Sequence, residues 1–242
     1  MEKQALREQI WDRLEADGTA RFPFPPHGRI PNFADHRTAT ARLAETTGWQ
    51  AADTLKCNPD APQLPVRRRA LRAGKTIYMA VPRLRDRQPF LRLDPAEIDD
   101  IDAATTVSGC SKHGVGVDPE EMPRIDLIVA GSVAVDRAGN RVGKGEGYSD
   151  LEFAVLSEFD RVDSDTTVAT TVHDTQVVDE NEITPDAHDV PLDLIVTPTE
   201  TIHTAAADAP QRRPAGIDWT ALSAEQLDEI PVLARLHPES DR

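Results

Sequence analysis

The sequence has few cysteines, few lysines and no long hydrophobic run. Cys57 and Cys110 are the only cysteines among 242 residues, so a fold held by a disulfide framework is excluded. No stretch approaches the ~20 apolar residues of a membrane-spanning helix. The N-terminus MEKQALREQIWDRLEADG is charged from its second residue and has no apolar segment of the signal-peptide type. These absences predict a soluble cytoplasmic protein with reduced thiols.

Positive charge is also scarce. The formal net charge is −15, with 26 Asp and 16 Glu against 22 Arg and only 5 Lys. A general nucleic-acid binder or a protein docked on an anionic membrane needs a basic face, so no nucleic-acid and no membrane partner is predicted. An acid-rich, lysine-poor composition is typical of a high-salt cytoplasm, where screening makes a dense acidic surface tolerable. An ordinary acidic protein is the alternative interpretation.

The apolar segments alternate between strand-like runs and helical spacing, which predicts βαβ units. Helices are expected at 2–16, Ala39–Thr46 and Ser149–Phe159, strands at Thr76–Val81, Leu127–Val135, Thr167–Val172 and Leu192–Val196, a strand or short helix at Val66–Ala73, and an ordered proline-rich loop at Arg21–Phe33. Near-continuous apolar runs are typical of strands covered on both faces. The predicted fold class is therefore α/β: three layers, α/β/α, around a mainly parallel sheet.

The C-terminal part of the chain has a different composition. The segment 204–216 is polar and contains Pro210 and Pro214, so it is predicted to be a linker. Apolar residues at helical spacing follow it, with an interruption at Pro231. We therefore predict an α/β domain over 1–203, a linker over 204–216, and a helical extension over 217–242 that packs on the domain.

The strongest functional motif is the run Arg141-Val-Gly-Lys-Gly-Glu-Gly-Tyr-Ser-Asp150, between an apolar strand and a helix. Its alternating glycines, Gly143, Gly145 and Gly147, let backbone N–H groups approach an anion closely. The following helix N-terminus favours negative charge, and Arg141 and Lys144 add full cations. Asp150 is placed to bind Mg²⁺ between phosphate oxygens. The run is neither a P-loop nor a dinucleotide fingerprint; it predicts a phosphate-binding loop, and the alternative is a tight turn with incidental charges.

This run resembles the Arg-[Leu/Val]-Gly-x-Gly-x-Gly-Tyr-x-Asp motif of the 5-formyltetrahydrofolate cyclo-ligase family. Other segments are similar to that family in the same order: Lys3-Gln-Ala-Leu-Arg7, Gly74-Lys75 before an apolar strand, Gln176, and Asp189-Val-Pro-Leu-Asp193 before the last strand. The resemblance covers roughly residues 2–200 and looks closest to the methenyltetrahydrofolate synthetase domain-containing branch.

The resemblance implies ATP- and Mg²⁺-dependent cyclisation of 5-formyltetrahydrofolate to 5,10-methenyltetrahydrofolate through a phosphorylated formyl intermediate. It implies nucleotide contacts from Lys3, Arg7, Arg141, Gly143, Lys144, Gly145, Glu146, Gly147 and Tyr148, with Tyr148 also against the folate. Arg141 and Lys144 would be the catalytic cations, and Asp150 and Asp189 the metal ligands. His173 is expected to be a structural histidine.

The sequence also departs from the family pattern. The family's Tyr-Tyr-Asp-Arg is Tyr148-Ser149-Asp150-Leu151 here, so one aromatic and one cation are missing. The stretch Pro65–Arg72 is basic and lacks the glutamate that contacts folate in the family; it could meet a folate's glutamate tail or be a solvated helix face. Two alternatives therefore stay open: a non-catalytic nucleotide- or folate-binding regulatory protein, and a different enzyme of similar architecture, such as a sugar-phosphate isomerase or CoA-transferase relative.

Overall fold

The computed structural model describes residues 2–204 and 213–238. Its helices are α1 (Lys3–Ala16), α2 (His36–Leu43), α3 (Thr47–Ala51), α4 (Leu64–Arg72), α5 (Ile101–Ala104), α6 (Val107–His113), α7 (Tyr148–Glu158), α8 (Ala224–Glu229) and α9 (Pro231–Leu236). Its strands are β1 (Ala20–Arg21), β2 (Asn32–Phe33), β3 (Thr54–Cys57), β4 (Thr76–Ala80), β5 (Phe90–Leu93), β6 (Val115–Val117), β7 (Leu127–Ala130), β8 (Ala134–Asp136), β9 (Arg141–Val142), β10 (Thr167–Thr171), β11 (Val177–Val178), β12 (Leu194–Val196) and β13 (Thr201–His203).

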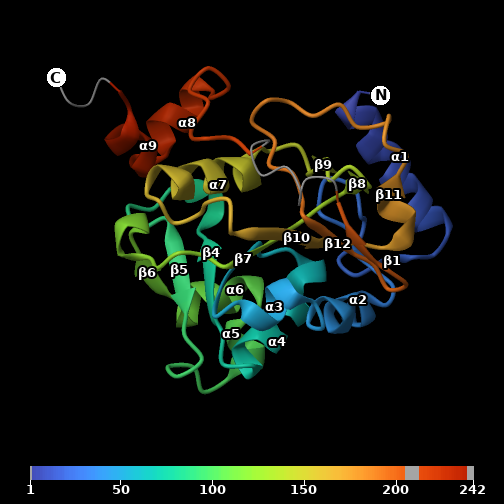
Figure 1. Cartoon of the computed structure of the whole chain (residues 1–242), viewed down its shortest axis with the longest axis horizontal. Coiled ribbons are helices and arrows are strands. Elements are labelled where there is room, and N and C mark those ends of the chain that lie inside the picture. The colour runs from blue at the N-terminus through green and yellow to red at the C-terminus, as the bar shows by residue number, and fades with distance from the viewer. Residues whose placement is uncertain (1, 205–212, 239–242) are drawn as a thin grey trace.

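The core is an eight-stranded sheet in the order β13-β12-β10-β7-β3-β4-β5-β6 (Figure 1). The five strands from β12 to β4 are parallel, and the strands outside them are antiparallel. Side chains alternate between two hydrophobic clusters: Ile77 and Met79 of β4 face one cluster, and Tyr78 faces the other. Because α2–α4 and α6 contribute to one cluster and α7 and α9 to the other, the predicted three-layer arrangement is confirmed.

The predicted single strand Leu127–Val135 is wrong, because the run forms two strands in two sheets. β7 lies in the main sheet, whereas β8 pairs with β9 and β11 in a three-stranded sheet against which α1 packs. The chain leaves the main sheet at Gly131, where a Cβ atom would stand 2.8 Å from Asp60 Oδ2. Every residue of the run is buried, so hydropathy alone does not reveal the change of sheet.

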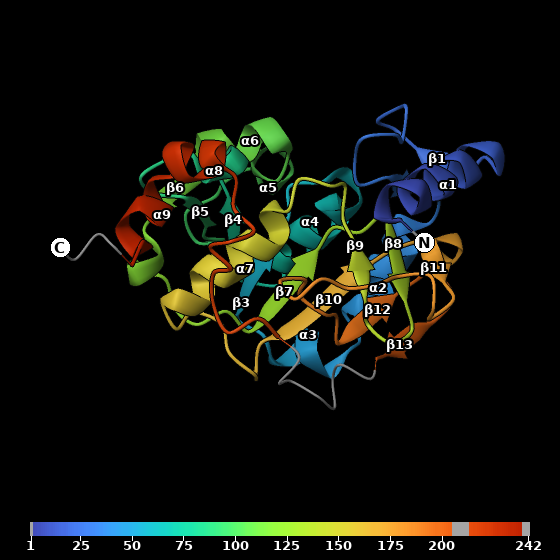
Figure 2. The ribbon, with the colours of Figure 1, turned by 90° about the horizontal axis from the view of Figure 1, so that it is seen from above.

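The other expected helices and strands form with small shifts of boundary. The helices, the strands β4, β10 and β12, and the helical alternative for 66–73 are confirmed, while Arg21–Phe33 is a loop whose ends belong to the β1–β2 pair. The predicted linker falls mostly on 205–212, outside the described residues. Beyond it, α8 and α9 meet at Pro231 and lie over α7 (Figures 1 and 2). None of the helices in the described ranges has the length and hydropathy of a membrane span.

Candidate functional site

A cavity of about 290 Å³ lies at the edge where β3, β4 and β7 end. The segments that follow these strands line it: Asn58–Asp60 after β3, Val81–Arg83 after β4, and Gly131 after β7. In parallel α/β sheets, ligands bind outside the carboxyl ends of the strands. This cavity, which we call the sheet-edge cavity, is therefore where the fold favours a ligand.

The predicted phosphate loop forms the opposite wall of the sheet-edge cavity. Gly145 and Gly147 have φ values of +105° and +72°, in the left-handed region that favours glycine. Gly147 directly precedes α7, so the loop ends at a helix N-terminus. The same loop also lines a second cavity of about 220 Å³. The two cavities share Glu146, Gly147 and Asp150, so both border the glycine loop.

Arg141 and Asp150 hold the two ends of this loop together. The guanidinium Nη2 donates to both carboxylate oxygens of Asp150, at 2.7 and 2.6 Å, and Nη1 donates to the Gly131 carbonyl at 2.9 Å. Burial alone lowers the pKa of Arg141, but the charge and hydrogen bonds of Asp150 outweigh it and raise that pKa. Val190 N–H also donates to Asp150 Oδ1, at 3.1 Å. The predicted cation and metal ligand are thus brought together as a buried ion pair.

Helix α1 brings the other predicted cations to the same place. Arg7 Nε donates to the Gly143 carbonyl at 2.7 Å, and a Cβ on Gly145 would stand 3.3 Å from Arg7 Cζ. Lys3 Nζ lies 2.5 Å from Asp189 Oδ2 and 2.7 Å from Asp186 Oδ2. Burial lowers the pKa of Lys3, but its hydrogen bonds to these two carboxylates raise it overall. Gly143 and Asp189, which follow α1 by about 140 and 185 positions in the sequence, therefore both contact side chains of α1.

The group Asp186, His188 and Asp189 could hold a cation. One possible ligand atom from each of the three residues lies within 4.8 Å of the other two. Within the described part of the chain, this is the group of His, Cys, Asp and Glu side chains close enough together to bind one metal ion. Carboxylate oxygens suit Mg²⁺, which is bound in proteins by one or two carboxylates together with water and phosphate oxygens. Asp189 was predicted as a ligand and belongs to this group; Asp186 was missed, because an exposed acid in an acidic loop carries no distinctive signal.

Sequence reasoning also missed the acid inside the sheet-edge cavity. Asp60 is partly buried, and desolvation raises the pKa of its carboxyl, although the charges of Lys144 and Arg67 oppose the shift. It lies five residues before the basic stretch Pro65–Arg72 in which no acid was found. The segment before it was not recognised as a strand because β3 is only four residues long and includes a lysine.

That lysine, Lys56, forms an ion pair with Glu152 of α7 beneath the sheet-edge cavity. Both side chains are buried, with 1% and 8% of their surface exposed. Ser149 Oγ and Lys56 Nζ both approach Asn58 Oδ1, at 3.5 and 3.4 Å. Asn58, Lys56 and Glu152 therefore form a polar floor that links β3 to the glycine-loop helix.

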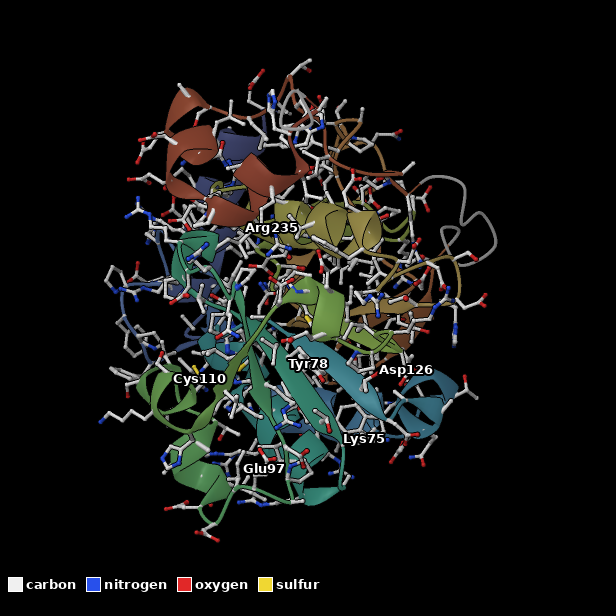
Figure 3. The ribbon with its side chains drawn as sticks, turned by 90° about the vertical axis from the view of Figure 1, so that its left-hand side faces the viewer. Lys75, Tyr78, Glu97, Cys110, Asp126 and Arg235 are labelled. Carbon is white, nitrogen blue, oxygen red and sulfur yellow. The ribbon has the colours of Figure 1, made fainter. Side chains whose placement is uncertain are left out.

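Other residues of the motifs lie elsewhere. Lys75 precedes β4 and Asp126 precedes β7, so both lie at the edge of the sheet where the parallel strands begin (Figure 3). His173 has the local contacts expected of a structural histidine: its Nδ1 contacts Thr175 at the start of a short 3₁₀ turn. Gln176 donates to the carbonyls of Ser132 and Val133.

The basic stretch Pro65–Arg72 is only partly a solvated face. Arg67 is 1% exposed and donates to the backbone carbonyls of Thr105, Asn58 and Asp60. The interpretation of this stretch as a solvated helix face is therefore wrong at Arg67, because its buried guanidinium binds the loop that carries Asp60.

Comparisons with known proteins agree with this geometry. A family model described as "5-formyltetrahydrofolate cyclo-ligase family" matches residues 1–198. The chain is 42% identical over 237 residues to a methenyltetrahydrofolate synthase domain-containing protein of Mus musculus (97% of this chain, 63% of that protein) and 38% identical over 237 residues to that of Homo sapiens (97% and 61%). It thus spans less than two thirds of these relatives' length.

A solved structure shares the fold. The NMR structure of Aquifex aeolicus 5,10-methenyltetrahydrofolate synthetase superposes with a TM-score of 0.52 at 18% identity, covering 84% of this chain and 93% of that one. Identity this low supports the fold alone, whereas the family match extends over most of the chain and includes the loop, α1 and the acidic segment. The chain belongs to the 5-formyltetrahydrofolate cyclo-ligase family.

Proposed function

We propose that this protein cyclises 5-formyltetrahydrofolate to 5,10-methenyltetrahydrofolate with ATP and Mg²⁺. The observation that carries the proposal is that three cations, Arg7, Arg141 and Lys144, lie on one glycine loop that lines two cavities, while Lys3 binds the neighbouring acidic segment through Asp189. Two cavities on a shared phosphate-binding loop suit a reaction in which a phosphoryl group passes from one substrate to another.

The reaction balances as two displacements. The formyl oxygen attacks the γ-phosphorus of ATP, ADP leaves, and the formyl carbon becomes an activated imidate phosphate. N10 of the folate then attacks that carbon, the N10 proton is lost, and inorganic phosphate leaves with the former formyl oxygen. An amide oxygen is a poor leaving group until it is phosphorylated, so catalysis consists of positioning and charge neutralisation.

The cations of this chain supply that neutralisation. Lys144 is the least constrained of them, since 36% of its side chain is exposed and its partner Glu146 is exposed as well, so it can move to a γ-phosphate. Arg141 keeps the loop ends together through Asp150, and Arg7 fixes the Gly143 carbonyl. Lys3 forms ion pairs with Asp186 and Asp189. Mg²⁺ bound by these two carboxylates would neutralise phosphate charge.

The pterin part of the reduced folate would occupy the sheet-edge cavity. Tyr148 and Asp60 both line it, together with apolar side chains such as Ile30 and Leu91. A pterin has several N–H donors on a flat ring, and a partly buried carboxylate is a suitable acceptor for them. Asp60 would then take the role of the family glutamate that is missing from Pro65–Arg72. The reaction would take place in a cytoplasm, with high salt consistent with the acidic composition.

One observation favours a non-catalytic nucleotide- or folate-binding regulator instead. Ser149 and Leu151 replace an aromatic and a cation of the family motif, and both oxygens of Asp150 are bound by Arg141. Such a regulator would bind ATP without turning it over.

The deciding experiment incubates the protein with 5-formyltetrahydrofolate and Mg²⁺ in high salt and follows the absorbance of the methenyl product. Product that forms only with ATP supports the enzyme. ATP binding without product supports the regulator, and absence of both ATP binding and product would refute the proposal.

A further inference from the structure

The second cavity is built in part by a segment beyond the family match. The match ends at residue 198, whereas one wall of the 220 Å³ cavity comes from residues beyond it: Gly216, Ile217, Asp218, Ala221, Leu222 and Gln226. The glycine loop and the first turns of α7 form the other wall. We call this space the extension cavity. Figure 1 shows the extension, with α8 and α9, lying along α7.

This wall is anchored rather than loosely apposed. Ile217 is 8% exposed, and its N–H donates to Glu158 Oε1 of α7 at 3.0 Å. Ile230, Val232 and Leu233 are fully buried in the cluster that includes α7. Ion pairs also join the extension to the domain, Arg85 to Glu229 and Arg235 to Asp118. The extension cavity therefore has two fixed walls, which is a condition for selective binding.

The lining has the chemistry of a site for a flat heterocycle. Leu151 and Ala154 of α7 form an apolar side opposite Ile217 and Leu222 of the extension. The polar side chains of the lining are His188, Gln226 and the carboxylates of Glu146, Asp150 and Asp218. Gln226 Oε1 accepts from Ser223 N–H at 2.9 Å, so its Nε2 is the donor that remains for a ligand. Apolar walls with a few polar groups suit a ring with hydrophobic faces and a hydrogen-bonding edge.

The size and position of the extension cavity restrict the kind of ligand that it can bind. Cavities for whole small molecules occupy about 300–1,000 Å³, so a cavity of about 220 Å³ suits one part of a larger ligand. The extension cavity reaches Gly145, Gly147 and Asp150 of the phosphate loop, and also His188 of the acidic group. A ligand whose phosphates lie on that loop would place its remaining part here.

We infer that the extension cavity binds the purine base of the nucleotide, and that the C-terminal extension thereby determines nucleotide affinity. The inference rests on the proposed function, because it assumes that ATP phosphates bind the glycine loop. It assigns the extension a binding role that the matched family region alone cannot fill.

The test compares two tryptophan substitutions in the extension. Ala221 is exposed and lines the extension cavity, whereas Ala224 is exposed and does not line it. Binding of ATP and of inorganic triphosphate is measured by titration calorimetry with Mg²⁺ for the wild type, Ala221→Trp and Ala224→Trp. Thermal unfolding of both variants checks that they are folded.

We expect Ala221→Trp to weaken ATP binding by at least about tenfold, while triphosphate binding stays within about twofold and Ala224→Trp changes neither. Unchanged ATP binding, or equal losses of ATP and triphosphate, would overturn the inference and leave the proposed function standing. If the wild type binds neither ligand, both are overturned.

A measurement on the wild type alone covers the case in which Ala221→Trp does not fold. ATP that carries a benzyl group on the purine N6 should bind at least about tenfold more weakly than ATP, because the walls are fixed. Equal affinity would place the base outside the extension cavity and refute the inference.

Discussion

At the scale of single residues, the site consists of charges that already have partners. Arg141 is paired with Asp150, Lys3 with Asp186 and Asp189, and Lys144 with Glu146. A buried pair is costly to break because the remaining charge is left uncompensated. The exposed Lys144–Glu146 pair is therefore the one whose lysine can be removed without disturbing the fold.

We expect Lys144→Ala to weaken ATP binding roughly 10- to 100-fold, because a hydrogen bond to a charged group contributes about 1.5–3 kcal/mol. The free energy of unfolding should change by less than ~1 kcal/mol, since the lost ion pair is exposed. Calorimetric titration and denaturant unfolding measure the two quantities. Lys112→Ala, at an exposed lysine of α6, is the control. Equal ATP affinity in both variants would remove Lys144 from the site.

Asp60→Asn tests the proposed folate-binding role of the sheet-edge cavity. We expect kcat/KM for 5-formyltetrahydrofolate to fall roughly 10- to 100-fold through loss of a charged acceptor, with ATP affinity unchanged. Asp99→Asn, at an exposed position, should behave as the wild type. A matching loss of ATP affinity in Asp60→Asn would mean that the carboxylate supports the loop rather than the folate.

At the scale of elements, α7 follows the glycine loop and anchors it to the hydrophobic core. Leu151–Leu156 are all buried, because the sheet covers one side of the helix and the extension another. Glu152 of this buried stretch reaches Lys56 of β3. The loop geometry therefore depends on a helix that is fixed to the sheet by both apolar contacts and a buried ion pair.

The buried pair predicts a non-additive response to mutation. Lys56→Met should lower the free energy of unfolding by about 3–5 kcal/mol, because Glu152 is left buried and unpaired, whereas Lys56→Met with Glu152→Met should recover most of that loss. Denaturant unfolding measures both. Loss of the exposed ion pair Arg137–Glu200 by mutation of Arg137 is the control, and it should lower the free energy of unfolding by less than ~1 kcal/mol. A double variant as unstable as the single one would contradict this account.

The docking of α9 should depend on pH. Hydrogen bonds from Arg235 lower the pKa of Asp118. A lowered carboxyl pKa contributes stability above the unfolded value of about 3.9, and this contribution is lost as the pH falls through the lower folded value. Amide exchange in α9 should therefore accelerate on acidification. In Asp118→Asn, exchange should already be faster at neutral pH and should change less with acid; an unaltered pH response would contradict the assignment.

At the scale of the whole molecule, the net charge of −15 predicts dependence on salt. Self-repulsion of the acidic surface opposes the folded state, and salt screens it. The thermal midpoint should rise with KCl, mostly below about 1 M, because the Debye length falls from about 10 Å at 0.1 M to about 3 Å at 1 M. Sucrose at matched osmolality is the control for solvent exclusion. A midpoint independent of KCl would contradict the high-salt interpretation.

Much of the architecture could be read from the sequence because the pattern of apolar residues is local. The alternation of segments indicated three layers, and the glycine loop was recognisable because its spacing and flanking charges are contiguous. The termini of α1 and α7 were predicted to within two residues. The family could be recognised for the same reason, since its motifs are short runs in a fixed order.

The tertiary structure decided what depends on contacts between distant segments. The run Leu127–Val135 is apolar throughout, so only the approach of Asp60 to Gly131 marks where it leaves the main sheet. Asp60 resembles any loop acid until the fold places it in the lining of a cavity. The pairing of Arg141 with Asp150, and the wall that the extension adds beside the loop, arise because packing brings charges and surfaces together across the fold, and no local pattern encodes those distances.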